Sequence, residues 1–292
     1  MSTNHKSPHA AQADASLLPP EGERFALGRP GGKTNPVLLK VGNVAMHFGG
    51  LVAISDMSFT LREGELLSLI GPNGAGKTTA FNVVTGFIRP TKGTVHFKDV
   101  NLADHSPYEI ASMGLVRTFQ RTSLFTNETV FDNVLTGLHL QGKASFLDTI
   151  LALPSFRREE RDLKEQVWDL LDFVGLSHRA KEQSGSLPYG EQRLLGVAIA
   201  LAARAQLLLL DEPAAGMNGA ETARFMEILQ KIRQRNISIL LVEHDMPLVM
   251  GVSDRVIVLN YGKIIADGTP AEIQNNPDVI EAYLGQGVKQ HA

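Results

Sequence analysis

The sequence predicts an α/β fold built around a mainly parallel β-sheet. Short, mostly apolar segments at 66–70, 207–210 and 237–242 have the length and composition of buried strands. Segments of helical length separate them, and a glycine-rich loop follows the first. Strands that are apolar on both faces and alternate with helices are typical of parallel sheets covered by helices on both sides. The 292 residues suffice for one large domain or two ordinary ones.

Composition excludes several classes of protein. The chain has 28 Lys and Arg, 31 Asp and Glu, and a net charge of −3, so we expect no nucleic-acid partner. It has no cysteine, which excludes disulfides, thiolate catalysis and cysteine-ligated zinc. The longest apolar stretch, Leu194–Ala203, is much shorter than the roughly 20 residues of a membrane-spanning helix. No secretory signal pattern precedes it, and we expect a cytoplasmic protein.

The first third of the chain predicts a tail, a strand pair and a helix. Residues 1–36 are rich in Pro, Gly, Ala, Ser and Asn and lack periodicity, which favours a disordered tail. The segments Val37–Phe48 and Leu51–Leu61 are strand-like and flank a Gly-Gly turn. A helix is expected at Lys77–Thr85, and an edge strand at Thr94–Phe97.

The remainder predicts helices first and then an alternation of strands and helices. Between Pro154 and Gly175, apolar residues recur at helical spacing on one face. Trp168 lies one position off this stripe, and we expect it to fill the core, with a role as a contact residue as the alternative. A helix at 220–235 and strands at 255–260 and 263–267 complete the predicted elements.

The loop after the first buried strand carries the clearest chemical motif. The G-x-x-x-x-G-K-[ST] pattern of a phosphate loop is matched by Gly71-Pro72-Asn73-Gly74-Ala75-Gly76-Lys77-Thr78. Glycines let backbone N–H groups turn toward phosphate oxygens, and the following helix adds its positive N-terminal end. Lys77 is expected to reach the β- and γ-phosphates, and the Thr78 hydroxyl to ligate Mg²⁺. A plain glycine-rich turn is the alternative.

Two further strand ends carry polar residues. Asp211 and Glu212 follow the apolar run 207–210, where a doubly wound sheet places its ligand. Asp211 is a candidate Mg²⁺ ligand, and Glu212 a candidate base for the attacking water. His244 follows another apolar run and is a candidate partner of the γ-phosphate. Without the phosphate loop, each of these would be an ordinary strand-end residue.

The segment Leu187-Pro188-Tyr189-Gly190-Glu191 resembles the signature of ATP-binding-cassette (ABC) ATPases, and the family's other motifs surround it in order. They are matched by Phe48 (the aromatic under adenine), Gly71–Thr79 (the phosphate loop), Gln120 (the Q-loop, a metal ligand), Asp211 and Glu212, Ala214–Asn218 (the D-loop) and His244 (the switch). Read alone, Gln120 would be a surface residue and Phe48 a core residue. The resemblance covers roughly 37–284.

This resemblance implies the phosphate-loop ATPase fold of ABC proteins, with a parallel-sheet core, an antiparallel β subdomain and an inserted helical subdomain at about 121–190. The ATP-binding domain would occupy 37–285, and 286–292 would be a C-terminal tail. Glu212, His244 and Lys77 would be catalytic, with ATP and Mg²⁺ bound. Two subunits would pair head to tail, each ATP lying between one phosphate loop and the other signature.

Three positions depart from the usual family pattern. Pro188 stands where a serine hydroxyl usually meets the γ-phosphate, Tyr189 replaces a glycine, and Asn218 stands where the D-loop often has aspartate. A lost phosphate donor costs about a few kcal/mol when nothing compensates for it. The departures therefore predict hydrolysis that is slow or depends on a partner.

The exact residues of several motifs resemble those of the ATPases of branched-chain amino-acid importers. Those strings include Leu-Pro-Tyr-Gly, Arg-Thr-Phe-Gln and Val279–Gly285, together with an extra segment at about 137–165. The partners implied are two transmembrane permease subunits, a second ABC ATPase (identical or paralogous) and, indirectly, a solute-binding protein, at the cytoplasmic face of the inner membrane. A coupling helix of the permease is expected to dock near Leu124, Phe125 and Phe131, which are equally compatible with core packing.

Other functions remain open from the sequence. An amide or urea importer fits the same motifs, and so does a lipopolysaccharide exporter, although the signature spelling argues against the exporter. A soluble, non-transport ABC protein usually carries two cassettes or long coiled-coil insertions, which this chain lacks. No Asn-Lys-x-Asp segment for guanine recognition is present, which disfavours a GTPase.

Overall fold

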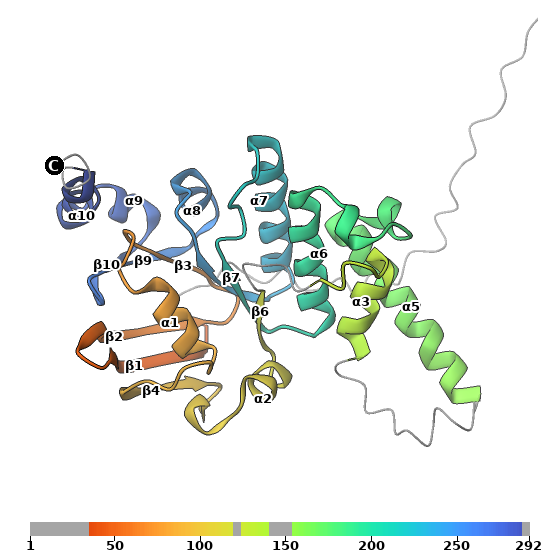
Figure 1. The fold of residues 1–292 in the computed structure, drawn as a ribbon, viewed down its shortest axis with the longest axis horizontal. Helices are drawn as coiled ribbons and strands as arrows, with labels where there is room; N and C mark the ends of the chain where they lie inside the picture. The colour runs from red at the N-terminus through yellow and green to blue at the C-terminus, as the bar shows by residue number, and fades with distance from the viewer. Residues whose placement is uncertain (1–34, 119–123, 140–153, 288–292) are drawn as a thin grey trace, which may run out of the picture.

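The computed structural model of the chain describes residues 35–118, 124–139 and 154–287, and the predicted tail at 1–36 lies almost wholly outside these residues. In this part of the chain, ten strands form one mixed sheet in the order β5-β4-β1-β2-β10-β9-β3-β8-β7-β6. Figure 1 shows its antiparallel strands on one side and a group of helices on the other. The predicted combination of a parallel core with an antiparallel part is confirmed.

The antiparallel part of the sheet comes from the first third of the described chain. Strands β1 (Val37–Phe48) and β2 (Leu51–Arg62) form a long hairpin, as expected. Strand β4 (Lys92–Phe97) pairs with the free side of β1. The expectation of an edge strand there is wrong, because the two-residue strand β5 (Val100–Asn101) covers its outer side.

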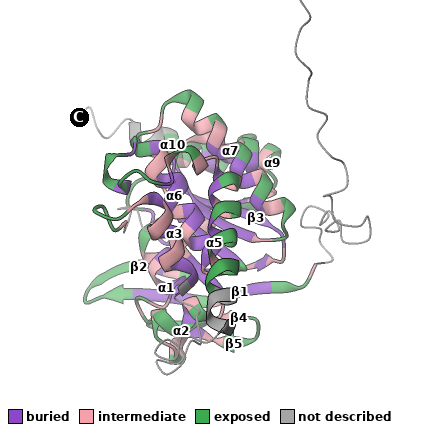
Figure 2. Cartoon of the chain, turned by 90° about the vertical axis from the view of Figure 1, so that its right-hand side faces the viewer, coloured by how far each residue is buried: buried purple, intermediate pink, exposed green. Residues whose placement is uncertain are grey.

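The parallel part consists of β9 (Arg255–Asn260), β3 (Leu66–Ile70), β8 (Ser238–Val242), β7 (Leu207–Asp211) and β6 (Leu115–Thr118). Every residue of β3, β7 and β8 is buried, as their mostly apolar sequences predict. Figure 2 shows this centre of the molecule as largely buried. Strand β10, which spans 263–268, runs antiparallel to β9 and touches β2, joining the two parts of the sheet.

Helix α5 ends at Val174, and the next residue, Gly175, has a φ of 72° in the left-handed region that commonly terminates helices. No helix in the described ranges is long and apolar enough to cross a membrane. The α-helices are α1 (Lys77–Val84), α2 (Pro107–Ser112), α3 (Val130–His139), α5 (Pro154–Val174), α6 (Tyr189–Ala202), α7 (Gly219–Gln234), α8 (Met246–Val252), α9 (Pro270–Gln274) and α10 (Pro277–Gly287). Short 3₁₀ turns lie at Leu102–Asp104, Ser177–Arg179 and Ser184–Ser186.

Helices α3, α5 and α6 pack against one another at one end of the molecule (Figure 1). The predicted stripe on α5 is confirmed, since Val167, Leu171 and Val174 are fully buried. The prediction that Trp168 fills the core is wrong, because its side chain is 44% exposed. Its ring rests at the surface with its centroid 5.4 Å from that of Phe131.

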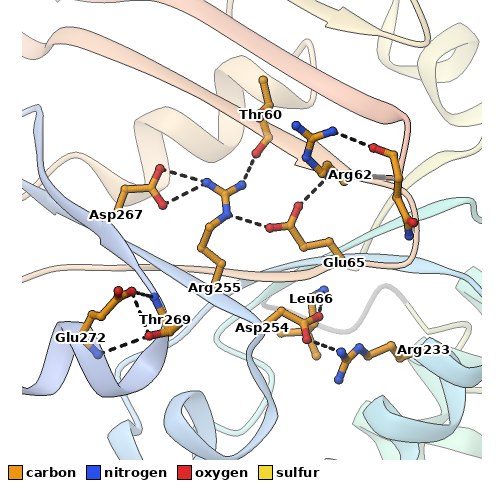
Figure 3. Close-up of polar contacts among 11 residues, drawn as sticks. Thr60, Arg62, Glu65, Leu66, Arg233, Asp254, Arg255, Asp267, Thr269 and Glu272 are labelled. Atoms are coloured by element: carbon orange, nitrogen blue, oxygen red, sulfur yellow. Dashed lines mark hydrogen bonds and ion pairs between the residues drawn. The ribbon is translucent and has the colours of Figure 1, made fainter. Parts of the chain in front are cut away.

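A polar network fastens the parallel core to the antiparallel strands (Figure 3). Arg255 on β9 donates to Glu65 Oε1 at 2.7 Å and to both oxygens of Asp267 at 2.9 Å. It also donates to the backbone carbonyl of Thr60 on β2. Glu65, in turn, accepts from the backbone N–H of Arg62. One guanidinium thus links three strands and a buried carboxylate.

Replacing Arg255 by alanine is expected to lower the free energy of unfolding by about 2–4 kcal/mol, because it leaves the buried Glu65 carboxylate without its cation. Urea unfolding followed by circular dichroism measures the change. The exposed Lys231 provides a matched control, and its alanine variant should change stability by less than about 0.5 kcal/mol. Equal stability of the two variants would contradict the role assigned to Arg255.

Candidate nucleotide-binding site

The ends of three parallel strands meet at one edge of the sheet. Strands β3 and β7 both pair with β8, where Val242 stands opposite Leu69 on one side and Asp211 on the other. The segments that follow these strands carry the phosphate loop, Glu212 and His244. Strand pairing therefore gathers residues from sequence positions far apart at the edge where parallel sheets bind ligands.

The predicted phosphate loop connects β3 to α1. The N–H of Ala75 donates to the carbonyl of Pro72 at 3.1 Å, and both of these loop residues are buried. Asn73, Gly74 and Thr78 are exposed, and a side chain added at Gly74 would meet nothing within 4 Å. Because the first N–H groups of α1 have no partner within the helix, they are available to phosphate oxygens.

Lys77 is the first residue of α1, and its side chain folds back along the loop. Its Nζ donates to the carbonyl oxygens of Gly71 and Pro72, at 2.6 and 3.1 Å. Burial lowers the pKa of Lys77, while the nearby carboxylates of Glu212 and Asp211 act in the opposite direction. The ammonium group is therefore held over the loop and within the field of both acids.

An arginine that the sequence did not single out holds Asp211. Arg117 on β6 donates to Asp211 Oδ2 at 2.9 Å and to Asn82 Oδ1 on α1 at 2.7 Å. Its guanidinium lies 4.8 Å from the centre of the Phe81 ring. Burial raises the pKa of Asp211, and Arg117 opposes that change. Arg117 thus orients the carboxylate at the end of β7.

Glu212 has an unusual backbone conformation for a glutamate. Its φ is 45°, in the left-handed region, which costs about 1–3 kcal/mol for a residue with a side chain. Its N–H donates to the carbonyl of Val242 at 2.8 Å, which holds the residue against the end of β8. The turn therefore directs the chain away from the sheet immediately after Asp211.

A second residue absent from the sequence prediction is Glu243. Its side chain is almost fully buried, with 1% of the residue exposed. Its Oε1 accepts from the N–H of Ala214 at 2.8 Å, and its Oε2 from that of His244 at 2.9 Å. The His244 side chain is mostly exposed, with its Nδ1 3.7 Å from Glu243 Oε2. One carboxylate therefore joins the segment after Glu212 to the backbone of the predicted switch histidine.

Replacing Glu243 by glutamine is expected to lower kcat for ATP hydrolysis by about 10-fold, the equivalent of one lost hydrogen bond to a charged group. The amide keeps a single acceptor and turns an N–H₂ group toward backbone donors. Steady-state phosphate release measures kcat and KM separately. Glu227 on α7 is exposed, and its glutamine variant provides the matched control. Wild-type kcat in Glu243→Gln would contradict this role.

The signature segment lies at the start of α6, which begins at Tyr189. Leu187 and Gly190 are buried, while Pro188 and Tyr189 are exposed. Pro188 precedes the helix without a side-chain hydrogen bond to it. The N-terminal N–H groups of α6 are thus preceded by exposed residues, an arrangement that suits an anion.

Two arginines form contacts with side chains of the signature segment. Arg193 donates to the Tyr189 hydroxyl, and its guanidinium lies 4.8 Å from the centre of that ring. Arg179 pairs with Glu191 at 3.2 Å. Helix α6 packs against α3 and α5, whereas α1 lies against β2, so the signature and the phosphate loop belong to different parts of the molecule (Figure 1).

Asn218, which departs from the family's aspartate, caps α7. Its Oδ1 accepts from the N–H groups of Ala220 and Glu221 at 3.0 Å, and Glu221 Oε2 accepts from the Asn218 N–H at 2.9 Å. Asparagine and aspartate are equally good N-caps, so the substitution preserves the start of α7. A Cβ on Gly190 would lie 2.9 Å from the Glu221 carboxylate, so a larger residue there would displace the Glu221 side chain.

The remaining predicted residues fall at the margins of the site or outside the described chain. Phe48 ends β1 at the tip of the hairpin and is 45% exposed, which leaves its ring free to stack on a base. Gln120 lies outside the described residues. Leu124 and Phe125 line an apolar pocket of about 340 Å³ between β6, α3 and α6. Phe131 is not among the residues that line this pocket, and both Leu124 and Phe131 pack against the helical core, the alternative that the sequence left open.

The residues at the sheet edge suit a magnesium–nucleotide complex. No cluster of three or more His, Asp or Glu side chains arranged for a metal occurs among the residues that the structure describes. Mg²⁺ in nucleotide sites is commonly held by one or two protein oxygens, water and the substrate phosphates. The Asp211 carboxylate and the exposed Thr78 hydroxyl provide such oxygens. This donor set fits the expected ion.

A phosphate loop at a strand-to-helix junction, with acids at the ends of neighbouring strands, defines a phosphate-loop nucleoside triphosphatase. The family model "ABC transporter" matches residues 54–215, more than half of the chain. The chain therefore belongs to the ABC transporter ATP-binding proteins and is an ATPase. A second model, "Branched-chain amino acid ATP-binding cassette transporter", matches residues 263–289.

Relatives with this architecture are similar over nearly their whole length. The high-affinity branched-chain amino acid transport ATP-binding protein LivG of Salmonella typhimurium is 47% identical, covering 85% of this chain and 98% of the relative. BraF of Pseudomonas aeruginosa, of the same description, is 43% identical over the same shares. The ADP conformation of an ATP-binding cassette of an ABC transporter superimposes with a TM-score of 0.75 at 29% identity, covering 86% of this chain and 100% of that one.

Proposed function

We propose that this chain is the ATP-hydrolysing subunit that powers an importer of branched-chain amino acids. The observation that carries the proposal is the 47% identity to a LivG protein over 98% of that protein's length. The match of residues 263–289 to a C-terminal model specific to such transporters supports it independently. The chain would act on ATP alone, while other subunits select the solute.

Within the site, each group has a distinct role. The N–H groups of the phosphate loop and the Lys77 ammonium bind the β- and γ-phosphates. Thr78 and Asp211, together with Gln120, would hold Mg²⁺, which neutralises charge that develops on the phosphates. Glu212 follows Asp211 and would orient or deprotonate the attacking water. The exposed His244, anchored through Glu243, would contact the γ-phosphate.

The separation of the signature from the phosphate loop supports a head-to-tail dimer. The N-terminus of α6, with Leu187–Glu191, would grip the γ-phosphate of ATP bound by a second ABC ATPase, identical or paralogous. Exposed Tyr189 and Pro188 would lie at that interface. ATP would hold the two subunits closed, and hydrolysis would release them.

The apolar pocket beside Leu124 and Phe125 supports docking on two transmembrane permease subunits. The end of β6 borders this pocket, so a coupling helix bound there would contact the strand that carries Arg117. The chain would then lie peripherally at the cytoplasmic face of the inner membrane, and a solute-binding protein would act with the complex. We assign residues 37–285 to one ATP-binding domain with a helical subdomain at about 121–190, and 1–36 and 286–292 to tails, the second of which begins within the last turn of α10.

Uptake of labelled leucine tests the proposal. In cells lacking this chain, uptake should be lost, and only the wild-type chain should restore it, whereas Glu212→Gln at equal expression should not. Restoration by Glu212→Gln would contradict an ATP-driven role. Unchanged leucine uptake on deletion would instead assign the ATPase to another solute, and labelled amides and urea would then be compared.

A further inference from the structure

Tyr189, the first residue of α6, places a ring where the signature pattern has a glycine. A glycine there could offer a nucleotide only its backbone, and no step of hydrolysis assigned above uses the ring. The residue is 44% exposed, and its hydroxyl accepts a hydrogen bond from Arg193, one helical turn further along α6. Because Arg193 is buried, this bond fixes the direction of the ring relative to the helix.

The ring lies against Gly216, in the segment 214–218 that follows Glu212. A Cβ built on Gly216 would lie 3.4 Å from Cε1 and 3.6 Å from Cδ1 of Tyr189. Apart from the chain neighbours of Gly216, no other described residue comes within 4 Å of that position. Gly216 has a φ of 82°, in the left-handed region that favours glycine. One edge of the ring therefore covers the middle of this segment.

The next residue of the signature contacts the end of the same segment. A Cβ on Gly190 would collide with the Glu221 carboxylate, so the backbone of α6 and this side chain are closely packed. The Glu221 carboxylate in turn accepts from the N–H of Asn218 at 2.9 Å. The first two residues of α6 thus contact both the middle of the 214–218 segment and the residue that pairs with its end.

Hydrogen bonds connect this segment to Glu212. The Ala215 N–H donates to the Glu212 carbonyl at 3.2 Å, and the Met217 N–H donates to the Ala214 carbonyl at 3.0 Å. The Ala214 N–H is held by Glu243. Glu212 has a strained backbone, and such a conformation persists only where the surrounding structure imposes it. The position of Glu212 therefore depends on what holds the 214–218 segment.

We propose that Tyr189 is a positioning residue for hydrolysis: its ring holds the 214–218 segment against the start of α6 and thereby fixes the turn that presents Glu212. The signature and Glu212 of one subunit then form one rigid unit, and a displacement of the signature by ATP on the partner subunit reaches Glu212. The inference deepens the proposed function, since it rests on the head-to-tail dimer and on the catalytic role of Glu212.

Two substitutions of Tyr189 test the proposal, because Tyr189→Leu removes the ring while Tyr189→Phe removes only the hydroxyl. In Tyr189→Leu, kcat for ATP hydrolysis should fall about 10-fold or more, since a small displacement of a catalytic group is costly. KM should stay within about 2-fold, because the phosphate loop is unchanged. Tyr189→Phe should retain kcat within about 3-fold. Tyr108 on α2 is 69% exposed, and Tyr108→Leu is the matched control.

Three kinetic outcomes would contradict these assignments. A wild-type kcat in Tyr189→Leu would overturn the proposal. Equal losses of kcat in Tyr189→Leu and Tyr189→Phe would overturn the role given to the ring. Failure of the wild-type chain to hydrolyse ATP would instead contradict the proposed function.

Hydrogen exchange separates positioning from a contact between subunits. Without nucleotide, the bonded N–H groups of Ala214, Ala215 and Met217 should exchange slowly in the wild-type chain. Peptides covering 214–218 should exchange about 5-fold faster or more in Tyr189→Leu, and as in the wild type in Tyr189→Phe. Peptides from β1 provide the internal control, and faster exchange there as well would overturn a local role. Unchanged exchange at 214–218 in Tyr189→Leu would overturn the proposal, whatever happens to kcat.

Discussion

Replacing Lys77 by alanine is expected to abolish measurable ATP turnover. The side chain extends along the phosphate loop to the carbonyls of Gly71 and Pro72. It lies in the field of Glu212 and Asp211, so its removal takes away one of the positive charges that offset these acids while phosphate charge is brought in. A lost charged donor at a transferring phosphate costs about 10²–10³-fold or more in kcat. Phosphate release and ATP binding by calorimetry measure the two effects.

The control for this variant is Lys40→Ala on the exposed side of β1, which should hydrolyse ATP like the wild type. A folded Lys77→Ala protein with full activity would show that the nucleotide is not bound at this loop. Its circular dichroism spectrum and melting temperature establish that it is folded. Because Lys77 is only partly buried, the substitution should leave the core intact.

Replacing Glu212 by glutamine is expected to slow hydrolysis by about 10²–10⁴-fold while ATP still binds. Glutamine keeps the size of the side chain and the strained turn that positions it, but it cannot take a proton from water. ATP should then persist at the interface of the head-to-tail pair, and the variant should elute as a dimer with ATP and as a monomer with ADP. Gel filtration with each nucleotide measures this directly.

The exposed Glu227 again provides the control, and Glu227→Gln should behave as the wild type on the column. A Glu212→Gln protein that remains monomeric at saturating ATP would contradict the dimer in which the α6 N-terminus grips the γ-phosphate. If the natural partner is a paralogue, the same shift should appear once that second ATPase is added. Full hydrolysis by the variant would remove Glu212 from its catalytic role.

The elements that carry the nucleotide site could be read from the sequence because their signals are local. The strands β3, β7 and β8 are short, mostly apolar runs without alternation, which is typical of strands buried on both faces. The phosphate loop is one contiguous segment, and the strand before it and helix after it place its N–H groups. The short strand β5 escaped prediction, since two residues form no pattern.

Residues that act through distant partners could not be found in the same way. Trp168 sits one position from the apolar stripe of α5, and its exposure depends on how that helix rotates against α3 and α6. The sequence around Arg117 and Glu243 gives no signal of the role of either residue. Their roles depend on strand pairing, which brings Arg117 to Asp211 across 94 positions and Glu243 to Ala214 across 29.

The sequence by itself thus determined the class of fold, the nucleotide chemistry and the family, because those depend on short contiguous patterns of polarity and backbone freedom. Only the tertiary structure decided what holds these groups in place: the arginine that orients Asp211 and the buried Glu243 between two loops. Such contacts arise when the sheet closes and buries polar groups, which must then find partners wherever the chain brings them.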